Sequence, residues 1–255
     1  MRPAWNGSGV FILWGAHSVD DDFCYNRVLV IAAHPDDIDY GVAGSVAVWT
    51  RGRKVVGYCV ATSGEKGFDR DLPIEERMRI REEEQQAAAG VVGVEDVFFL
   101  RRPDGELENT RSLQREIVSV IRRFRPDVVV ARDPASARFD SFYGCHPDHR
   151  AIAEAVFDAI YPAAGNRFFF PDLLKSGLEP HKVKEVLFGS SSSPDYYVDI
   201  SPTLELKIKA LRCHRSQIGD EENVEEVLRD WARKVGEPAG IPLAEAFRRM
   251  KNPEA

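Results

Sequence analysis

The chain has 255 residues and a formal net charge of −7 at pH 7. Its pI near 5.5 leaves no general positive field for a polyphosphate backbone, so we expect no nucleic-acid partner. Hydrophobic residues make up 44% and charged residues 29% of the chain, as in water-soluble globular proteins. We expect one α/β domain over residues 26–255, preceded by an N-terminal extension over residues 1–25.

The start of the chain does not resemble a membrane anchor or a secretion signal. Its apolar run, residues 10–16, is far shorter than the roughly 20 residues of a membrane-spanning helix, so we expect no membrane span. Only one arginine precedes the run, and no small-residue cleavage site follows it. The four cysteines are widely separated and form no C-x-x-C pair, which favours reduced thiols and a cytoplasmic location.

Apolar runs predict four strands, at residues 28–33, 55–61, 97–100 and 128–131, and the first is expected to be covered on both faces. Helical patterns separate them, at residues 44–51, 73–92 and 112–124. The many Glu and Arg residues of the second helix are interpreted mainly as solvated surface. Strands that alternate with helices favour right-handed crossovers, which predicts a Rossmann-like, doubly wound α/β domain with a mostly parallel sheet and helices on both faces.

The second half of the chain gives weaker signals. A helix is expected from His149 to about residue 160, followed by short strands at residues 186–188 and 196–200 and a helix from about 202 to 211. No element is assigned between residues 162 and 180, where Pro and Gly recur. From residue 220 onward we expect two charged helices, separated by residues 236–242 and belonging to the same domain.

Polar residues follow each of the four strands, and in parallel sheets ligands lie beyond the carboxyl ends of the strands. We therefore expect His34, Ser63, Asp104 and Asp133 to line one pocket.

Two short clusters carry most of the chemistry. Residues 33–37 read Ala-His-Pro-Asp-Asp, and residues 146–149 read His-Pro-Asp-His. One such cluster is usually a structural turn, but two at the ends of predicted elements favour a shared site. Two imidazoles and one carboxylate would suit a catalytic zinc ion, and a second carboxylate would serve as base. The remaining imidazole would stabilise an oxyanion or protonate a leaving amine. Spacing alone does not say which carboxylate binds the metal.

Two other site types fit these residues less well. A dinucleotide or phosphate site would need a G-x-G-x-x-G or P-loop string, and the first strand is followed by His-Pro-Asp-Asp instead. A cysteine nucleophile at Cys145 would need an imidazole within reach, but adjacent residues of an extended segment point apart, which disfavours pairing with His146.

The paired clusters resemble the motifs of the LmbE/PIG-L family of zinc-dependent de-N-acetylases. The resemblance extends from about Arg27 to Gln217 and includes weaker matches, among them the 62–65 loop, Arg81 with Glu84 on the long predicted helix, 103–105 and 214–217. The segment from residue 195 to His214 is also faintly similar to the subgroup that contains diacetylchitobiose deacetylases.

The resemblance implies a role for each cluster residue. His34, Asp37 and His149 would be the zinc ligands. Asp36 would be the general base that activates water, and His146, oriented by Asp148, would stabilise the tetrahedral oxyanion. Arg81 and Asp104 would contact sugar hydroxyls. Ile38 stands where many relatives have a glutamate.

The implied activity is hydrolysis of the N-acetyl or N-acyl amide of a small N-acetylglucosamine-type amino sugar or its glycoconjugate. The alternative is a catalytically inactive metal- and carbohydrate-binding protein, which would have no need of Asp36, His146 and Asp148. The motifs do not select among substrates, the same donor set would also accept iron or cobalt, and a homo-oligomer is compatible with the sequence.

Overall fold

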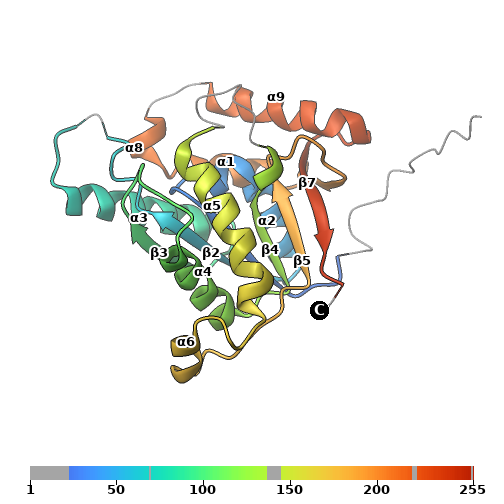
Figure 1. Cartoon of the computed structure of the whole chain (residues 1–255). Helices are drawn as coiled ribbons and strands as arrows, with labels where there is room; N and C mark the ends of the chain where they lie inside the picture. The colour runs from blue at the N-terminus through green and yellow to red at the C-terminus, as the bar shows by residue number, and fades with distance from the viewer. Residues whose placement is uncertain (1–22, 69, 137–144, 220–222, 254) are drawn as a thin grey trace, which may run out of the picture.

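The computed structural model describes residues 23–68, 70–136, 145–219, 223–253 and 255. At its centre is a seven-stranded sheet in the order β3-β2-β1-β4-β5-β7-β6 (Figure 1). The strands are β1 (Arg27–Ala32), β2 (Val55–Thr62), β3 (Asp96–Arg102), β4 (Val128–Arg132), β5 (Glu185–Gly189), β6 (Tyr196–Asp199) and β7 (Ala244–Lys251). Neighbours from β3 to β5 pair in parallel, whereas β7 runs antiparallel to both β5 and β6. The sheet is therefore mostly parallel, as predicted.

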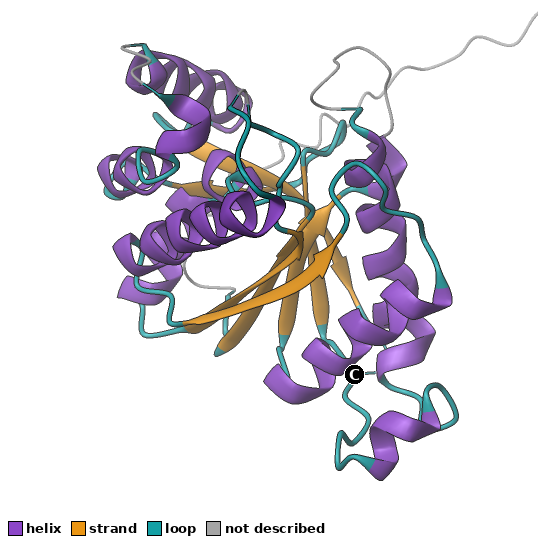
Figure 2. Cartoon of the chain, turned by 90° about the vertical axis from the view of Figure 1, so that its left-hand side faces the viewer, coloured by secondary structure: helices purple, strands orange, loops and turns teal. Residues whose placement is uncertain are grey.

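Helices connect and cover the strands. They are α1 (Asp37–Gly41), α2 (Ala43–Arg51), α3 (Ile74–Val91), α4 (Arg111–Phe124), α5 (Pro147–Asp158), α6 (Pro171–Lys175), α7 (Leu204–Leu211), α8 (Arg215–Ile218) and α9 (Val224–Gly236). A π-helical segment, Ala159–Ala164, continues α5. Figure 2 shows the sheet lying between two layers of helices.

The two layers follow from the alternation of side chains along the strands. In β1, Val28 and Val30 pack into one buried cluster together with residues of α2, α3, α7 and α9. Leu29 and Ile31 pack into a second cluster on the opposite face, with residues of α4 and α5. Because β1 is apolar on both faces, it is buried on both sides of the sheet. The prediction of a doubly wound α/β fold is confirmed.

The last element was predicted wrongly. Residues 244–251 were expected to form a charged helix, but they form strand β7 between β5 and β6. Two of its charged side chains have buried partners: Glu245 is buried with Lys207, and Arg248 pairs with buried Asp133. Ion pairs with distant residues override the local pattern here.

Three shorter segments also differ from prediction. Residues 37–41 form α1 directly after the first cluster, and residues 171–175 form α6 in the stretch that had no assigned element. Most of the predicted extension, residues 1–22, lies outside the described residues. Phe23, however, is buried and stacks on Trp49 with ring centroids 5.4 Å apart, so the packed fold begins before residue 26.

The strand order places the first cluster at a binding position. β1 lies between β2 and β4, so the order of the strands changes direction at this point. Open α/β sheets bind ligands at such switch points, beyond the carboxyl ends of the strands. A cavity of about 90 Å³ lies here, between the ends of β1 and β4, and Asp37 and His149 are among its lining residues.

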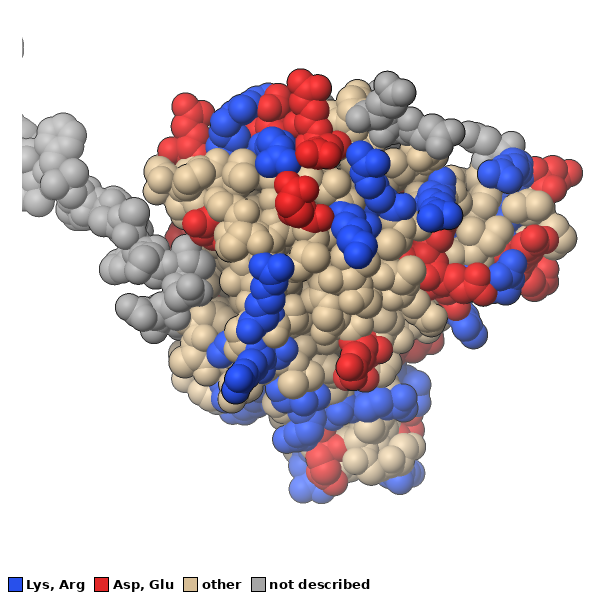
Figure 3. Space-filling view, turned by 180° about the vertical axis from the view of Figure 1, so that it is seen from behind, with Lys and Arg blue, Asp and Glu red and all other residues tan. Residues whose placement is uncertain are grey.

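The surface carries charges of both signs. On the face seen in Figure 3, Lys and Arg lie beside Asp and Glu around a broad uncharged area. Within the described ranges, no helix combines the length and the apolar character of a membrane span.

Candidate metal centre and active site

The two clusters meet above the end of β1. His34 follows that strand, and His146 caps the N-terminus of α5, where its Nδ1 accepts a hydrogen bond from the Asp148 backbone N–H at 3.3 Å. Pro147 at the first helical position favours this start. The rings of His34, His146 and His149 form a triangle with centroid distances of 4.9, 5.2 and 5.4 Å. The clusters, predicted to share one site, do lie together.

Three donor atoms are spaced as a metal ion would require. His34 Nδ1 lies 3.3 Å from His149 Nε2, which lies 3.0 Å from Asp37 Oδ1. His34 Nδ1 is also 3.4 Å from Asp37 Oδ2. Ligands about 2.1 Å from a tetrahedral zinc ion lie about 3.4 Å from one another. The donor set His34, Asp37 and His149 therefore fits a metal of this kind.

The second nitrogen of His34 faces carboxylates. Its Nε2 lies 3.1 Å from Asp148 Oδ2 and 3.1 Å from Asp104 Oδ1. Metal-binding histidines commonly donate their other ring N–H to a carboxylate, which leaves the first nitrogen free for the metal. Backbone N–H groups of Gly105 and Leu107 fix the Asp148 carboxylate at 2.7 and 3.0 Å.

This arrangement differs from one expectation. The Asp148 carboxylate was expected to orient His146, but its hydrogen bonds go to His34 and to the 105–107 backbone. Asp148 contacts His146 through its backbone N–H instead, because both residues belong to the first turn of α5.

The centre is strongly negative. Burial alone would lower the pKa of His34, but hydrogen bonds with Asp104, Asp148 and Asp37 raise it to about 12. The pKa of Asp37 falls well below its usual range because the hydrogen bonds from His149 and His34 outweigh burial. The same carboxylates favour a metal cation here, which would take the place of the second proton of His34, the one on Nδ1.

Asp36 and His146 have different environments. Burial raises the pKa of Asp36 to about 6, helped by Asp37 and opposed by Arg81. Burial and the nearby His34 lower the pKa of His146. His146 is therefore neutral near pH 7, and because its Nδ1 accepts a hydrogen bond, its proton lies on Nε2.

The comparisons with known proteins agree with this site. The family model PIG-L, described as GlcNAc-PI de-N-acetylase, matches residues 29–160, which include both clusters. The chain belongs to the PIG-L family. It is 36% identical over 225 residues to diacetylchitobiose deacetylase of Thermococcus kodakarensis, across 87% of this chain and 82% of that protein.

Two further comparisons support this assignment. The chain is 31% identical over 215 residues to probable N-acetyl-alpha-D-glucosaminyl L-malate deacetylase 2 of Bacillus subtilis, across 82% of this chain and 88% of that protein. N,N'-diacetylchitobiose deacetylase from Pyrococcus horikoshii, complexed with its inhibitor MPG, has a TM-score of 0.84 at 31% identity, across 92% of this chain and 88% of that chain. The resemblance to deacetylases of this family, inferred from the sequence, is confirmed.

In this PIG-L family chain, the two residues expected to contact sugar are engaged inside the protein. Arg81 is only 3% exposed, and its Nη2 donates to Pro35 O at 2.6 Å and lies 3.4 Å from Asp36 Oδ2. Asp104 is 7% exposed, and its oxygens bond with His34 and with the Lys66 N–H at 2.9 Å. Their role in sugar contact stays a prediction.

Two other residues expected in the pocket use their side chains elsewhere. Ser63 Oγ donates to Glu82 at 2.7 Å, and Asp133 forms a two-point ion pair with Arg248 of β7. Ile38, which stands where many relatives have a glutamate, is buried in the core at 1% exposure.

Three buried polar residues lie behind the site, and sequence reasoning gave none of them a role. Gln85 of α3, Asp39 of α1 and His214 before α8 are each 0% exposed, and Asp39 bonds with both of the others. Only His214 was noted, as part of the 214–217 match. Interpreting α3 as solvated surface concealed Gln85. The available signal was its position four residues after Arg81, on the same helix face.

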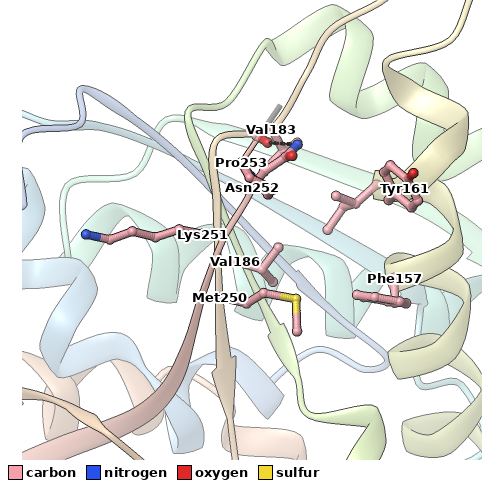
Figure 4. A pocket seen from close by; sticks show the side chains of 9 residues that line it. Phe157, Tyr161, Val183, Val186, Met250, Lys251, Asn252 and Pro253 are labelled. Carbon is pink, nitrogen blue, oxygen red and sulfur yellow. Dashed lines mark hydrogen bonds between the residues drawn. The ribbon is translucent and has the colours of Figure 1, made fainter. Parts of the chain in front are cut away.

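A second, apolar pocket lies away from the imidazoles. It has a volume of about 230 Å³ and lies between the end of α5 and strands β5 and β7 (Figure 4). Phe157, Val186 and Met250 are among its lining residues, and the two clusters contribute none. This pocket is therefore separate from the candidate metal centre at the switch point.

Proposed function

We propose that this chain is a zinc-dependent N-deacetylase that removes the acetyl group from a small N-acetylated amino sugar or its glycoconjugate. The convergence of the two clusters carries the proposal: His34, Asp37 and His149 offer three donors to one ion, and Asp36 and His146 flank them. The relatives named for diacetylchitobiose and N-acetylglucosaminyl malate support this substrate class.

His34, Asp37 and His149 would hold the zinc ion. When bound, zinc supplies Lewis-acid chemistry that polarises the acyl carbonyl and lowers the pKa of a water. Asp148 and Asp104 keep the proton of His34 on Nε2, so that Nδ1 presents a lone pair.

Asp36 would take the proton from the attacking water. Its side chain is 17% exposed, and Asp36 directly precedes the proposed ligand Asp37 in the chain. The Arg81 guanidinium beside it favours the carboxylate form. The proton taken by Asp36 is then available to the departing amine nitrogen.

His146 would stabilise the oxyanion. As a neutral ring with its proton on Nε2, it donates a hydrogen bond to the acyl oxygen as negative charge develops there. A neutral imidazole suits hydrogen-bond donation better than proton supply, which is why we assign the proton transfer to Asp36.

The test is a mass-spectrometric assay of the zinc-loaded protein with N-acetylglucosamine, diacetylchitobiose and N-acetylglucosaminyl malate. Loss of an acetyl group from at least one of them, with none from metal-free protein, is the expected result. The substrate assignment is wrong if all three stay intact while a related deacetylase cleaves them under the same conditions.

We also propose that residues 26–255 act as one domain and that the protein is cytoplasmic. The packing of α7, α9 and β7 onto the same sheet as β1 supports a single unit. Limited proteolysis that released a folded C-terminal fragment would contradict the first proposal, and a membrane or secreted fraction would contradict the second.

A further inference from the structure

Asp36 has an unusual backbone conformation. Its φ of 91° and ψ of −31° lie in a region that residues with a side chain rarely adopt. Such a conformation persists only where the surroundings hold it, and these residues occur preferentially at functional sites. The groups that hold Asp36 therefore set the direction of its carboxylate.

Two side chains of α3 hold the peptide unit between Pro35 and Asp36 from both sides. Arg81 Nη2 donates to Pro35 O at 2.6 Å, and the Asp36 N–H donates to Gln85 Oε1 at 3.1 Å. Arg81 and Gln85 are four residues apart, so they project from the same face of the helix. One face of α3 thus fixes both polar groups of this peptide.

The orientation of the Gln85 amide is itself fixed. Its Nε2 donates to Asp39 Oδ2 at 2.9 Å, and the same oxygen lies 2.8 Å from His214 Nε2. Because an amide presents an oxygen on one side and an NH₂ on the other, binding Asp39 turns the oxygen towards Asp36. The order of contact is His214, Asp39, Gln85 and then the Asp36 peptide.

Glu84, which precedes Gln85 in α3, anchors the segment that carries His214. The Glu84 carboxylate accepts hydrogen bonds from the Ser216 N–H at 2.8 Å and from the Ser216 hydroxyl at 2.6 Å. The same turn of α3 therefore anchors the segment that carries His214 and binds the peptide of Asp36.

The array is poorly suited to a purely stabilising role. Within the described part of the chain, Asp39 Oδ1 and His214 Nδ1 are buried without a hydrogen-bond partner. Partly satisfied buried polar groups are costly, and apolar residues of similar volume often stabilise a protein better. This favours a role in geometry.

We propose that Gln85, Asp39 and His214 form a positioning array that holds the Pro35–Asp36 peptide and thereby directs the Asp36 carboxylate. The inference rests on the proposed function, in which Asp36 is the base. The three residues do not touch the reacting atoms; they act through Asp36.

The first test compares Gln85→Met with Gln86→Met. Gln85→Met removes the amide and keeps the length of the side chain, whereas Gln86 is an exposed neighbour on the same helix. We expect kcat of Gln85→Met to fall roughly 100-fold, with KM and zinc content unchanged. Gln86→Met should match the wild type. A kcat for Gln85→Met within about twofold of wild type would overturn the proposal.

A second test needs no activity. Crystal structures of the wild type and Gln85→Met should show Asp36 leaving its positive φ, with its carboxylate displaced. An Asp36 that keeps the same conformation in Gln85→Met overturns the array, whether or not a substrate has been found. If the wild type cleaves no substrate, the proposed function fails. The comparison of the two crystal structures still shows whether Gln85 holds the conformation of Asp36.

The third test measures His214→Phe alone and in combination with Gln85→Met. The single variant His214→Phe tests the array even if Gln85→Met does not fold. His214 acts through Gln85, so His214→Phe should lower kcat without lowering zinc content. The double variant should be no slower than the slower single variant. A His214→Phe enzyme with wild-type kcat, or losses that multiply in the double variant, would contradict a single array.

Discussion

The Nε2 atom of His34 lies 3.1 Å from a carboxylate oxygen of Asp148, a contact that joins the two polar clusters across 114 positions of sequence. Asp148 is fully buried at the start of α5, and backbone N–H groups of Gly105 and Leu107 hold its carboxylate. One carboxylate therefore fixes the ring and the tautomer of a proposed metal ligand on a different element.

We predict that Asp148→Asn weakens zinc affinity by about 10- to 100-fold, because the neutral amide holds the Nε2 proton of His34 less firmly. The measurement is a zinc titration against a competing chelator. Asp172→Asn, at the exposed ion pair with Arg115, is the matched control and should bind zinc like the wild type. Equal affinities in all three proteins would show that Asp148 does not support the ligand.

The proposed division of roles between base and ligand gives a second prediction. Asp36→Ala should keep its zinc and lose roughly 10²- to 10⁴-fold in kcat, because it removes proton transfer alone. His149→Ala should lose zinc, because two donors remain. The measurements are the zinc content and kcat of the two purified variants. Equal zinc loss in both would contradict the assignment of Asp36 as base and His149 as ligand.

Gly64 provides a prediction about packing against Arg81. Its φ is +61°, and a Cβ at this position would lie 2.8 Å from Arg81 Nη2. We expect Gly64→Ala to lower the free energy of unfolding by about 1–3 kcal/mol and to reduce kcat, since Arg81 must move away from Pro35 O.

Gly90→Ala is the control for Gly64→Ala. Gly90 is exposed in α3, and a Cβ there would meet no atom within 4 Å. This substitution should stabilise the protein by up to about 1 kcal/mol. Urea unfolding curves measure both, and a Gly64→Ala variant as stable as Gly90→Ala would show that Arg81 is not confined.

The parts of the fold that sequence predicts are those with local signals. Continuous apolar runs identify β1, β2 and β4 because both faces of these strands are buried. The shorter apolar run of β3 also predicts its strand, although β3 lies at the edge of the sheet and is only half-buried. The two clusters are recognisable because imidazoles and carboxylates beside proline are unusual where a strand or loop ends. Their meeting follows from the carboxyl-end rule for parallel sheets.

The parts that sequence misses depend on distant partners. The charges of residues 244–251 indicate a solvated helix until their partners are known, and Arg248 pairs with a residue 115 positions away. Gln85 likewise resembles a surface residue of a charged helix, and its place on the same helix face as Arg81 does not identify its partners, which are Asp36 and Asp39. Hydrophobic periodicity carries no information about such pairs.

The pair between Asp133 and Arg248 links β7 to the end of β4. Arg248 Nε and Nη2 donate to the two carboxylate oxygens at 2.8 and 2.7 Å, and the Asp133 side chain is 1% exposed. Burial would raise the pKa of Asp133, but hydrogen bonds from Arg248, Ser191 and the Ala135 N–H outweigh burial and lower it to about 2. The pKa of an aspartate in an unfolded chain is about 3.9.

This lowered pKa predicts how the stability of β7 depends on pH. Above about pH 4 the carboxylate stabilises the folded state in full, and as pH falls from about 4 to about 2 the contribution is lost. The stability difference between the wild type and Asp133→Asn should therefore be largest at neutral pH and shrink over that window. Asp71→Asn, at an exposed position, should show no such trend. Urea unfolding at a series of pH values tests this, and a difference that does not change with pH would mean that the ion pair contributes nothing.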